Sequence, residues 1–183
     1  MSPIIDIDLL RHGETEGDAR YCGSTDISLA AAGWDQMWAV VGNDARWETI
    51  VSSPLKRCAQ FAEALAQRHR LALRIDDRLR ELHFGNWEGR SAAEIMQTDA
   101  EDLTRFWRNP SQHAPPGGES LTMLQTRVLS AWQDILAECR TALVVTHGGP
   151  IRIILCHLHG TSIDDSLRID IPHASLWRTR KPT

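Results

Sequence analysis

The sequence predicts an α/β fold built on one central, mostly parallel sheet. Apolar segments of strand length alternate along the chain with segments of helical periodicity, a pattern typical of parallel sheets covered by helices. A length of 183 residues is enough for one domain with a substantial core. We therefore expect residues 1–183 to form a single domain.

Three strands are predicted in the first half of the chain. Residues 4–10 alternate apolar side chains with Asp before becoming wholly apolar, and residues 49–52 and 71–75 are short apolar runs. Two helices should separate these strands. One is expected to be capped by Ser28 and to end near residue 41, and the other begins after Pro54.

The second half adds a long helix and a buried strand. Residues 91–118 are expected to form two short helices as an insertion over the site, and a long amphipathic helix follows over about 119–138. Residues 141–146 are predicted to form a buried strand, followed by a short apolar helix. We expect the last strands at 167–171 and 175–180.

Charge and hydropathy exclude several functions. The chain has 20 Lys and Arg against 24 Asp and Glu, so its net charge of −4 gives no global attraction for nucleic acid. No apolar run is long enough to cross a membrane, and the N-terminus does not resemble a signal peptide. The four cysteines are far apart in the sequence, which indicates reduced thiols and favours a cytoplasmic protein.

Polar residues suited to phosphate chemistry follow two of the predicted strands. His12 follows the first strand within Arg11-His12-Gly13, and His147 follows the strand 141–146 in a His-Gly-Gly motif. Because ligands bind beyond the carboxyl ends of parallel strands, both imidazoles are expected at the site. Segments between them contribute Arg57 and Glu81.

These residue types match the needs of phosphoryl transfer. A neutral imidazole is a nucleophile near neutral pH. Arginine forks match phosphate oxygens, and they oppose the negative charge of the transition state. A carboxylic acid can protonate the leaving alkoxide. For this role Glu88, Asp76 and Asp77 compete with Glu81, and the residues alone leave the choice open.

The ordered motifs resemble those of the histidine phosphatase, or phosphoglycerate mutase-like, superfamily. They are Arg11-His12-Gly13, the segment 53–57, the segment around Glu81 and the motif 146–149. Together they span nearly the whole chain. The resemblance implies a three-layer α/β sandwich and a phosphatase that uses no metal and no cofactor.

The resemblance also implies a role for each matching residue. His12 would be the phosphorylated nucleophile, and Glu81 would protonate the leaving group and then activate water. Arg11, Arg57 and His147 would clamp the phosphoryl oxygens. The backbone amide of Gly148 would lie close to them.

Within the superfamily the chain is most similar to the α-ribazole phosphatases of cobalamin synthesis. The similarity rests on Gly-Glu-Thr-Glu at 13–16, on residues 84–89 and on residues 116–120. The implied partner is a small phosphorylated metabolite. The alternatives are a broad-specificity sugar or metabolite phosphatase, a mutase, and a non-catalytic phosphate-binding module. A mutase is disfavoured because residues 91–118 are short, and the binding module because binding alone needs no proton donor. The sequence does not indicate an oligomeric state.

Four further residues are candidates for the substrate side of the site. Glu14 and Thr15 follow the first motif, and Trp87 and Trp107 fall in segments expected near its mouth, where one of them could stack on an aromatic base. Glu14 could equally be the partner of a loop ion pair. One position departs from the family: Asp18 stands where Asn is usual, which leaves its role open.

Three other histidines need no catalytic or metal-binding role. His157 and His159 are two residues apart on a predicted helix and do not share a face, so we expect no metal site there. His83 could either line the site or be structural.

Overall fold

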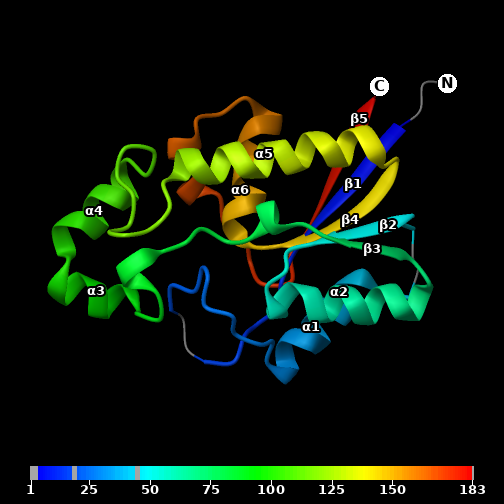
Figure 1. The fold of residues 1–183 in the computed structure, drawn as a ribbon, viewed down its shortest axis with the longest axis horizontal. Helices are drawn as coiled ribbons and strands as arrows, with labels where there is room; N and C mark the ends of the chain where they lie inside the picture. Colours follow the sequence, from blue (N-terminus) through cyan, green and yellow to red (C-terminus); the bar gives the residue numbers. More distant parts are fainter. Residues whose placement is uncertain (1–3, 18–19, 44–45, 183) are drawn as a thin grey trace.

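The computed structural model describes residues 4–17, 20–43 and 46–182. Within these residues a five-stranded sheet has the order β3-β2-β4-β1-β5 (Figure 1). The strands are β1 Ile4–Arg11, β2 Thr49–Ser52, β3 Ala72–Ile75, β4 Thr141–Thr146 and β5 Leu176–Pro182. All pairings are parallel except that of β5 with β1. The mostly parallel α/β sheet predicted from the sequence is confirmed.

Helices cover both faces of this sheet. The helices are α1 Ala31–Val41, α2 Lys56–His69, α3 Ala92–Thr98, α4 Ala100–Arg108, α5 Leu121–Glu138 and α6 Gly148–His159. Helices α5 and α6 lie on one face, and α1 and α2 on the other (Figure 1). The pair α3 and α4 falls within the predicted insertion and lies beside the N-terminal end of α5 (Figure 1).

Strand β4 is apolar between its two terminal threonines because both of its faces are buried. Ala142 and Val144 belong to the core cluster formed with α5 and α6. Leu143 and Val145 belong to the cluster formed with α1 and α2. Successive side chains point to opposite faces, and both faces are covered, which favours apolar side chains at these four positions.

The segment 167–171 is not the strand that the sequence predicted. A 3₁₀-helix, Ile163–Arg168, includes its first two residues, and residues 169–171 follow that helix without forming a strand. The Ser162 side chain accepts a hydrogen bond from the Asp164 amide at its N-terminus. The apolar residues that suggested a strand pack instead against the α5–α6 core, as Ile169 and Ile171 do.

Helix α1 also starts later than expected. Its N-cap is Ala30 rather than Ser28. Leu29 instead forms a β-bridge with Thr15, and the Ser28 carbonyl accepts a hydrogen bond from the Glu16 amide. Pairing with the chain after β1 therefore replaces the first helical turn. No helix among the described residues is long and apolar enough to cross a bilayer.

A buried carboxylate in β1 allows a test of what holds the fold. Asp8 is 1% exposed and accepts hydrogen bonds from Arg46, at 2.6 and 2.9 Å, and from the Trp47 indole at 2.8 Å. We expect Asp8→Asn to lower the free energy of unfolding by about 1–3 kcal/mol, because the half-buried Arg46 loses its countercharge. Urea denaturation measures this change. An unchanged midpoint would contradict it.

Candidate active site

The parallel pairing of β1 with β4 brings the two motif histidines together. Arg11 is in register with Thr146, the last residue of each strand, so His12 and His147 leave the sheet side by side. The His12 amide donates to the Thr146 carbonyl at 3.0 Å. The centroids of the two imidazole rings are 5.2 Å apart.

A cavity of about 640 Å³ opens over this edge of the sheet. Arg11, His12, Arg57 and Glu81 line it, which brings four residues from three separate segments to one space. His147 does not line it: its side chain is completely buried. The expected histidines therefore differ in exposure, with His12 reaching the cavity and His147 packed beside it.

His12 is held as a neutral imidazole with one nitrogen free. Its Nδ1 lies 2.8 Å from the Gly13 carbonyl oxygen. A carbonyl can only accept, so Nδ1 carries the proton and Nε2 keeps its lone pair. Burial, together with the positive charges of Arg57 and Arg11, holds the pKa of His12 well below its usual value. The ring can therefore act as a nucleophile near neutral pH.

His147 has the opposite tautomer. Arg57 Nε donates to His147 Nδ1 at 3.2 Å, so the proton is on Nε2, which lies 2.8 Å from Ser53 Oγ and donates to it. Burial and the neighbouring Arg57 and His12 also hold the pKa of His147 well below its usual value.

The two motif arginines are fixed mainly by backbone carbonyls. Arg57 is 1% exposed and donates to the carbonyls of Thr25 at 2.8 Å, Cys22 at 3.0 Å and Gly23 at 2.9 Å. Arg11 donates to the Ile171 carbonyl and leaves its buried Nε without a partner. Both guanidiniums are thus oriented before any anion binds.

Glu81 sits against the start of α6. The Gly149 amide lies 3.1 Å from both carboxylate oxygens, and the Leu82 amide donates to Oε1 at 2.8 Å. A Cβ atom at position 149 would lie 2.1 Å from Oε1, so only glycine permits this contact. The Arg127 guanidinium fixes the Glu81 carbonyl at 2.9 Å.

The structure distinguishes Glu81 from its three rivals. The Asp76 carboxylate binds Arg78, and Asp77 binds Arg80. The Glu88 carboxylate is occupied by donors of residues 23–25. Of these four carboxylates, Glu81 alone lines the cavity.

Residues 7–180 match the sequence pattern of the histidine phosphatase superfamily, branch 1. The chain belongs to that superfamily. It is 33% identical over 170 residues to a glucosyl-3-phosphoglycerate phosphatase of Mycolicibacterium vanbaalenii, covering 86% of this chain and 75% of the relative. It is 40% identical over 154 residues to a Mycobacterium tuberculosis protein described as bifunctional, covering 80% of this chain. The chain spans 42% of the length of that relative.

Solved structures of superfamily members superpose closely on this chain. A mycobacterial glucosyl-3-phosphoglycerate phosphatase gives a TM-score of 0.85 at 30% identity, covering 96% of this chain and 89% of the other. The α-ribazole phosphatase of Shigella flexneri gives 0.84 at 25% identity, covering 95% and 89%. The similarity thus includes relatives named for different substrates.

A second cavity of about 280 Å³ lies next to the larger one. Glu81 and Arg152 line both cavities. Most of the other lining residues are apolar or aromatic: Tyr21, Leu82, Phe84, Phe106, Trp107, Leu121, Leu124 and Leu167. An apolar space therefore adjoins the Glu81 carboxylate.

The two tryptophans expected on the substrate side have different positions. Trp107 is 44% exposed, lines the apolar cavity and donates from Nε1 to the Tyr21 hydroxyl at 3.1 Å. Trp87 is completely buried between Tyr21 and Phe106 and lines neither cavity. This corrects the expectation for Trp87, whose apolar ring is part of the core.

The remaining candidate residues differ in whether they line a cavity. Glu14 and Thr15 line the larger cavity, and the Glu14 carboxylate accepts from Gln36 Nε2 at 2.6 Å. His83 lines neither cavity and contacts Ser24 and Glu88. Asp18 lies outside the described residues. In residues 4–17, 20–43 and 46–182, no three His, Cys, Asp or Glu side chains are grouped so that they could hold a metal.

Arg152 and His173 are among the cavity residues that sequence reasoning missed. Arg152 follows Gly148 by one helical turn, a spacing that could have placed it at the same end of α6. His173 precedes β5; its ring centroid is 5.5 Å from that of His12, and Arg11 Nη2 lies 2.9 Å from its Nε2. The antiparallel pairing of β5, which starts where β1 ends, brings His173 to the site, and the sequence carries no signal for that pairing.

The two neutral histidines make stability depend on pH. Because burial depresses their folded-state pKa values, only the unfolded chain gains protons as the pH falls through 6.5. We expect the free energy of unfolding to fall below pH 6.5 by about 1.4 kcal/mol per pH unit for each histidine. Urea denaturation between pH 7.5 and 5 measures this slope. His12→Gln should reduce it, whereas replacing exposed His157 by Gln should not; a flat profile would contradict the prediction.

Proposed function

We propose that this chain is a phosphatase that hydrolyses small phosphomonoesters through a phosphohistidine at His12. One observation carries the proposal: a neutral imidazole with a free Nε2 and a carboxylate share one cavity with two oriented guanidiniums. A binding module would not need the carboxylate, which repels an anion. The residue roles below complete this proposal.

In the first step His12 Nε2 attacks phosphorus, and the bond to the ester oxygen breaks. Protonated Glu81 gives its proton to that oxygen, so the alcohol leaves neutral. Arg11, Arg57 and the amide of Gly148 at the N-terminus of α6 stabilise the negative charge on the three remaining oxygens. His147 would act on these oxygens only through Arg57, whose Nε donates to its Nδ1.

In the second step water replaces the imidazole. The Glu81 carboxylate takes a proton from water as the water oxygen attacks the phosphohistidine. The phosphorus–nitrogen bond breaks, inorganic phosphate forms, and His12 regains its lone pair. Glu81 ends protonated, ready for the next ester.

We expect Glu81→Gln to separate these steps. With p-nitrophenyl phosphate the leaving group needs no proton, so the phosphoenzyme should form but hydrolyse about 10²–10⁴-fold more slowly. Labelled phosphate trapped without acid should then accumulate on His12.

His12→Ala is the control for the same experiment, because without the nucleophile no label can be trapped. Full turnover by that variant would refute the mechanism.

α-Ribazole 5′-phosphate is the leading substrate that we propose, with a role in cobalamin synthesis. The apolar cavity beside Glu81 supports it, since a benzimidazole base is planar and largely apolar. Its aromatic lining, including Trp107 and Phe84, suits such a ring. A structural relative named α-ribazole phosphatase supports the same substrate.

A broad-specificity metabolite phosphatase is the second candidate. The guanidiniums of Arg20 and Arg152 in the larger cavity favour substrates with an additional anionic group. Relatives named for glucosyl-3-phosphoglycerate and phosphoserine agree with that chemistry. Measuring kcat/KM for α-ribazole 5′-phosphate, glucosyl-3-phosphoglycerate and phosphoserine discriminates between the two candidate functions. A clear preference for the first ester supports the α-ribazole phosphatase, and similar values for all three support broad specificity.

Trp107 provides a direct test of the apolar cavity. We expect Trp107→Leu to lower kcat/KM for α-ribazole 5′-phosphate about tenfold, because stacking on the base is lost. The kcat/KM for p-nitrophenyl phosphate should fall less. Trp34→Leu is the matched control, since Trp34 packs against Phe61 in the other core cluster. Equal losses on both substrates would contradict base stacking.

A further inference from the structure

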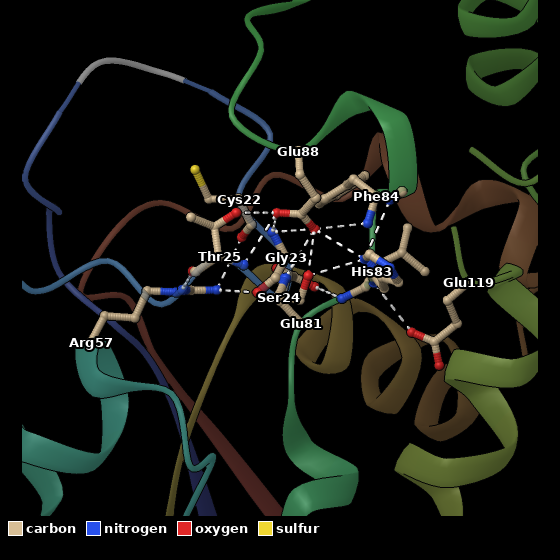
Figure 2. Close-up of polar contacts among 12 residues, drawn as sticks. Cys22, Gly23, Ser24, Thr25, Arg57, Glu81, His83, Phe84, Glu88 and Glu119 are labelled. Atoms are coloured by element: carbon tan, nitrogen blue, oxygen red, sulfur yellow. Dashed lines mark hydrogen bonds and ion pairs between the residues drawn. The ribbon is translucent and has the colours of Figure 1, made fainter. Parts of the chain in front are cut away.

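The loop Cys22–Thr25 lies between the partly buried carboxylate of Glu88 and the buried guanidinium of Arg57, as Figure 2 shows. Its backbone amides donate to Glu88, and its backbone carbonyls accept from Arg57. The peptide dipoles of the loop are thus aligned between the two charges. Hydrogen bonds arranged in this way polarise and strengthen one another.

Both oxygens of the Glu88 carboxylate accept several hydrogen bonds from this loop. Its carboxylate accepts from the Ser24 amide at 2.9 Å, the Thr25 amide at 3.2 Å and the Thr25 hydroxyl at 2.6 Å. The Gly23 amide lies 3.1 Å from both oxygens. A Cβ atom on Gly23 would lie 1.8 Å from the Leu82 carbonyl oxygen and 2.7 Å from Glu88 Oε1, so the loop can approach only with glycine there.

Glu88 remains charged under all ordinary conditions. Burial alone would raise its pKa, but the hydrogen bonds from Thr25, Phe84 and Ser24 outweigh burial and lower the pKa to about 2. A carboxylate in that state cannot supply a proton near neutral pH. Its role must therefore be electrostatic and structural.

The Arg57 end has no direct countercharge. Its guanidinium is 1% exposed, and among the described residues it forms no ion pair with any carboxylate. Three loop carbonyls and His147 receive its hydrogen bonds instead. An unpaired buried cation is costly, and carbonyls polarised by an anion behind them reduce that cost.

We propose that Glu88 is a positioning residue that holds Arg57 in its phosphoryl-binding orientation through the loop Cys22–Thr25. The effect extends one residue further, because Arg57 Nε fixes the tautomer of His147. Glu88 touches neither cavity, so it acts on phosphate only through Arg57. This inference rests on the proposed function, since it assigns Arg57 to the phosphoryl group.

The test measures binding of inorganic phosphate by calorimetry and kcat/KM for p-nitrophenyl phosphate. We expect Glu88→Gln to weaken phosphate binding about tenfold and to lower kcat/KM about 10- to 100-fold. Arg57→Gln should produce a similar loss. The double variant should be no worse than Arg57→Gln alone, because Glu88 works through that side chain.

Two further variants separate positioning from loss of folding. Thr25→Val keeps Glu88 and the backbone but removes the 2.6 Å hydroxyl bond, so it should give a smaller loss that disappears in the Arg57→Gln background. Asp8→Asn is the matched control: it also disrupts a buried carboxylate held by several N–H donors, but lines neither cavity. It should lower stability and leave phosphate binding unchanged.

Several results would overturn the inference. Unchanged phosphate affinity in Glu88→Gln and Thr25→Val would do so, as would losses that multiply fully in the double variant. The limbs of the pH–kcat/KM profile should keep their positions in Glu88→Gln; a moved limb would make Glu88 a titrating group and refute positioning. A wild-type chain that binds phosphate but turns over no ester would refute the proposed function alone, because the binding comparison still tests Glu88.

Discussion

The parallel ladder between β1 and β4 is the constraint on which the rest of the site depends. Both strands end at the same level, with Arg11 opposite Thr146, so the residues after them must share one edge of the sheet. His12 and His147 then lie in contact without any loop having to bring them together. The covered sheet makes this geometry stiff, because β4 is buried on both faces between two core clusters.

Around this edge the protein gathers positive charge before an anion arrives. Arg57 is buried and Arg11 half-buried, and carbonyl groups rather than carboxylates bind them. Such an arrangement preserves net positive charge in the cavity, whereas a direct ion pair would cancel it. Burial and then the same positive charges hold the pKa of both imidazoles well below its usual value, so the cations that surround the cavity also favour neutral histidines. A chain with a net charge of −4 can therefore bind an anion locally.

The sequence predicts those parts of the site that follow strands directly. His12 and His147 were predictable because an apolar run and a motif coincide at each of them. Residues whose position depends on packing were not predictable from the sequence. The segment 167–171 was predicted as a strand, but it contains the end of a 3₁₀-helix and the residues that follow it. Trp87 was predicted to contact the substrate, but its side chain is buried in the core. His173 reaches the site only through antiparallel β5, and nothing local in its segment indicates that pairing.

The contact between Gly149 and Glu81 has a consequence for recognising related chains. The carboxylate occupies the space that a side chain at position 149 would need, at 2.1 Å from its first carbon. A homologue could keep both histidines and both arginines and still carry a larger residue there. The Glu81 carboxylate would then have to leave the Gly149 amide, which lies 3.1 Å from both of its oxygens here. The second glycine of the His-Gly-Gly motif therefore fixes the place of a carboxylate that lies 68 positions earlier in the chain.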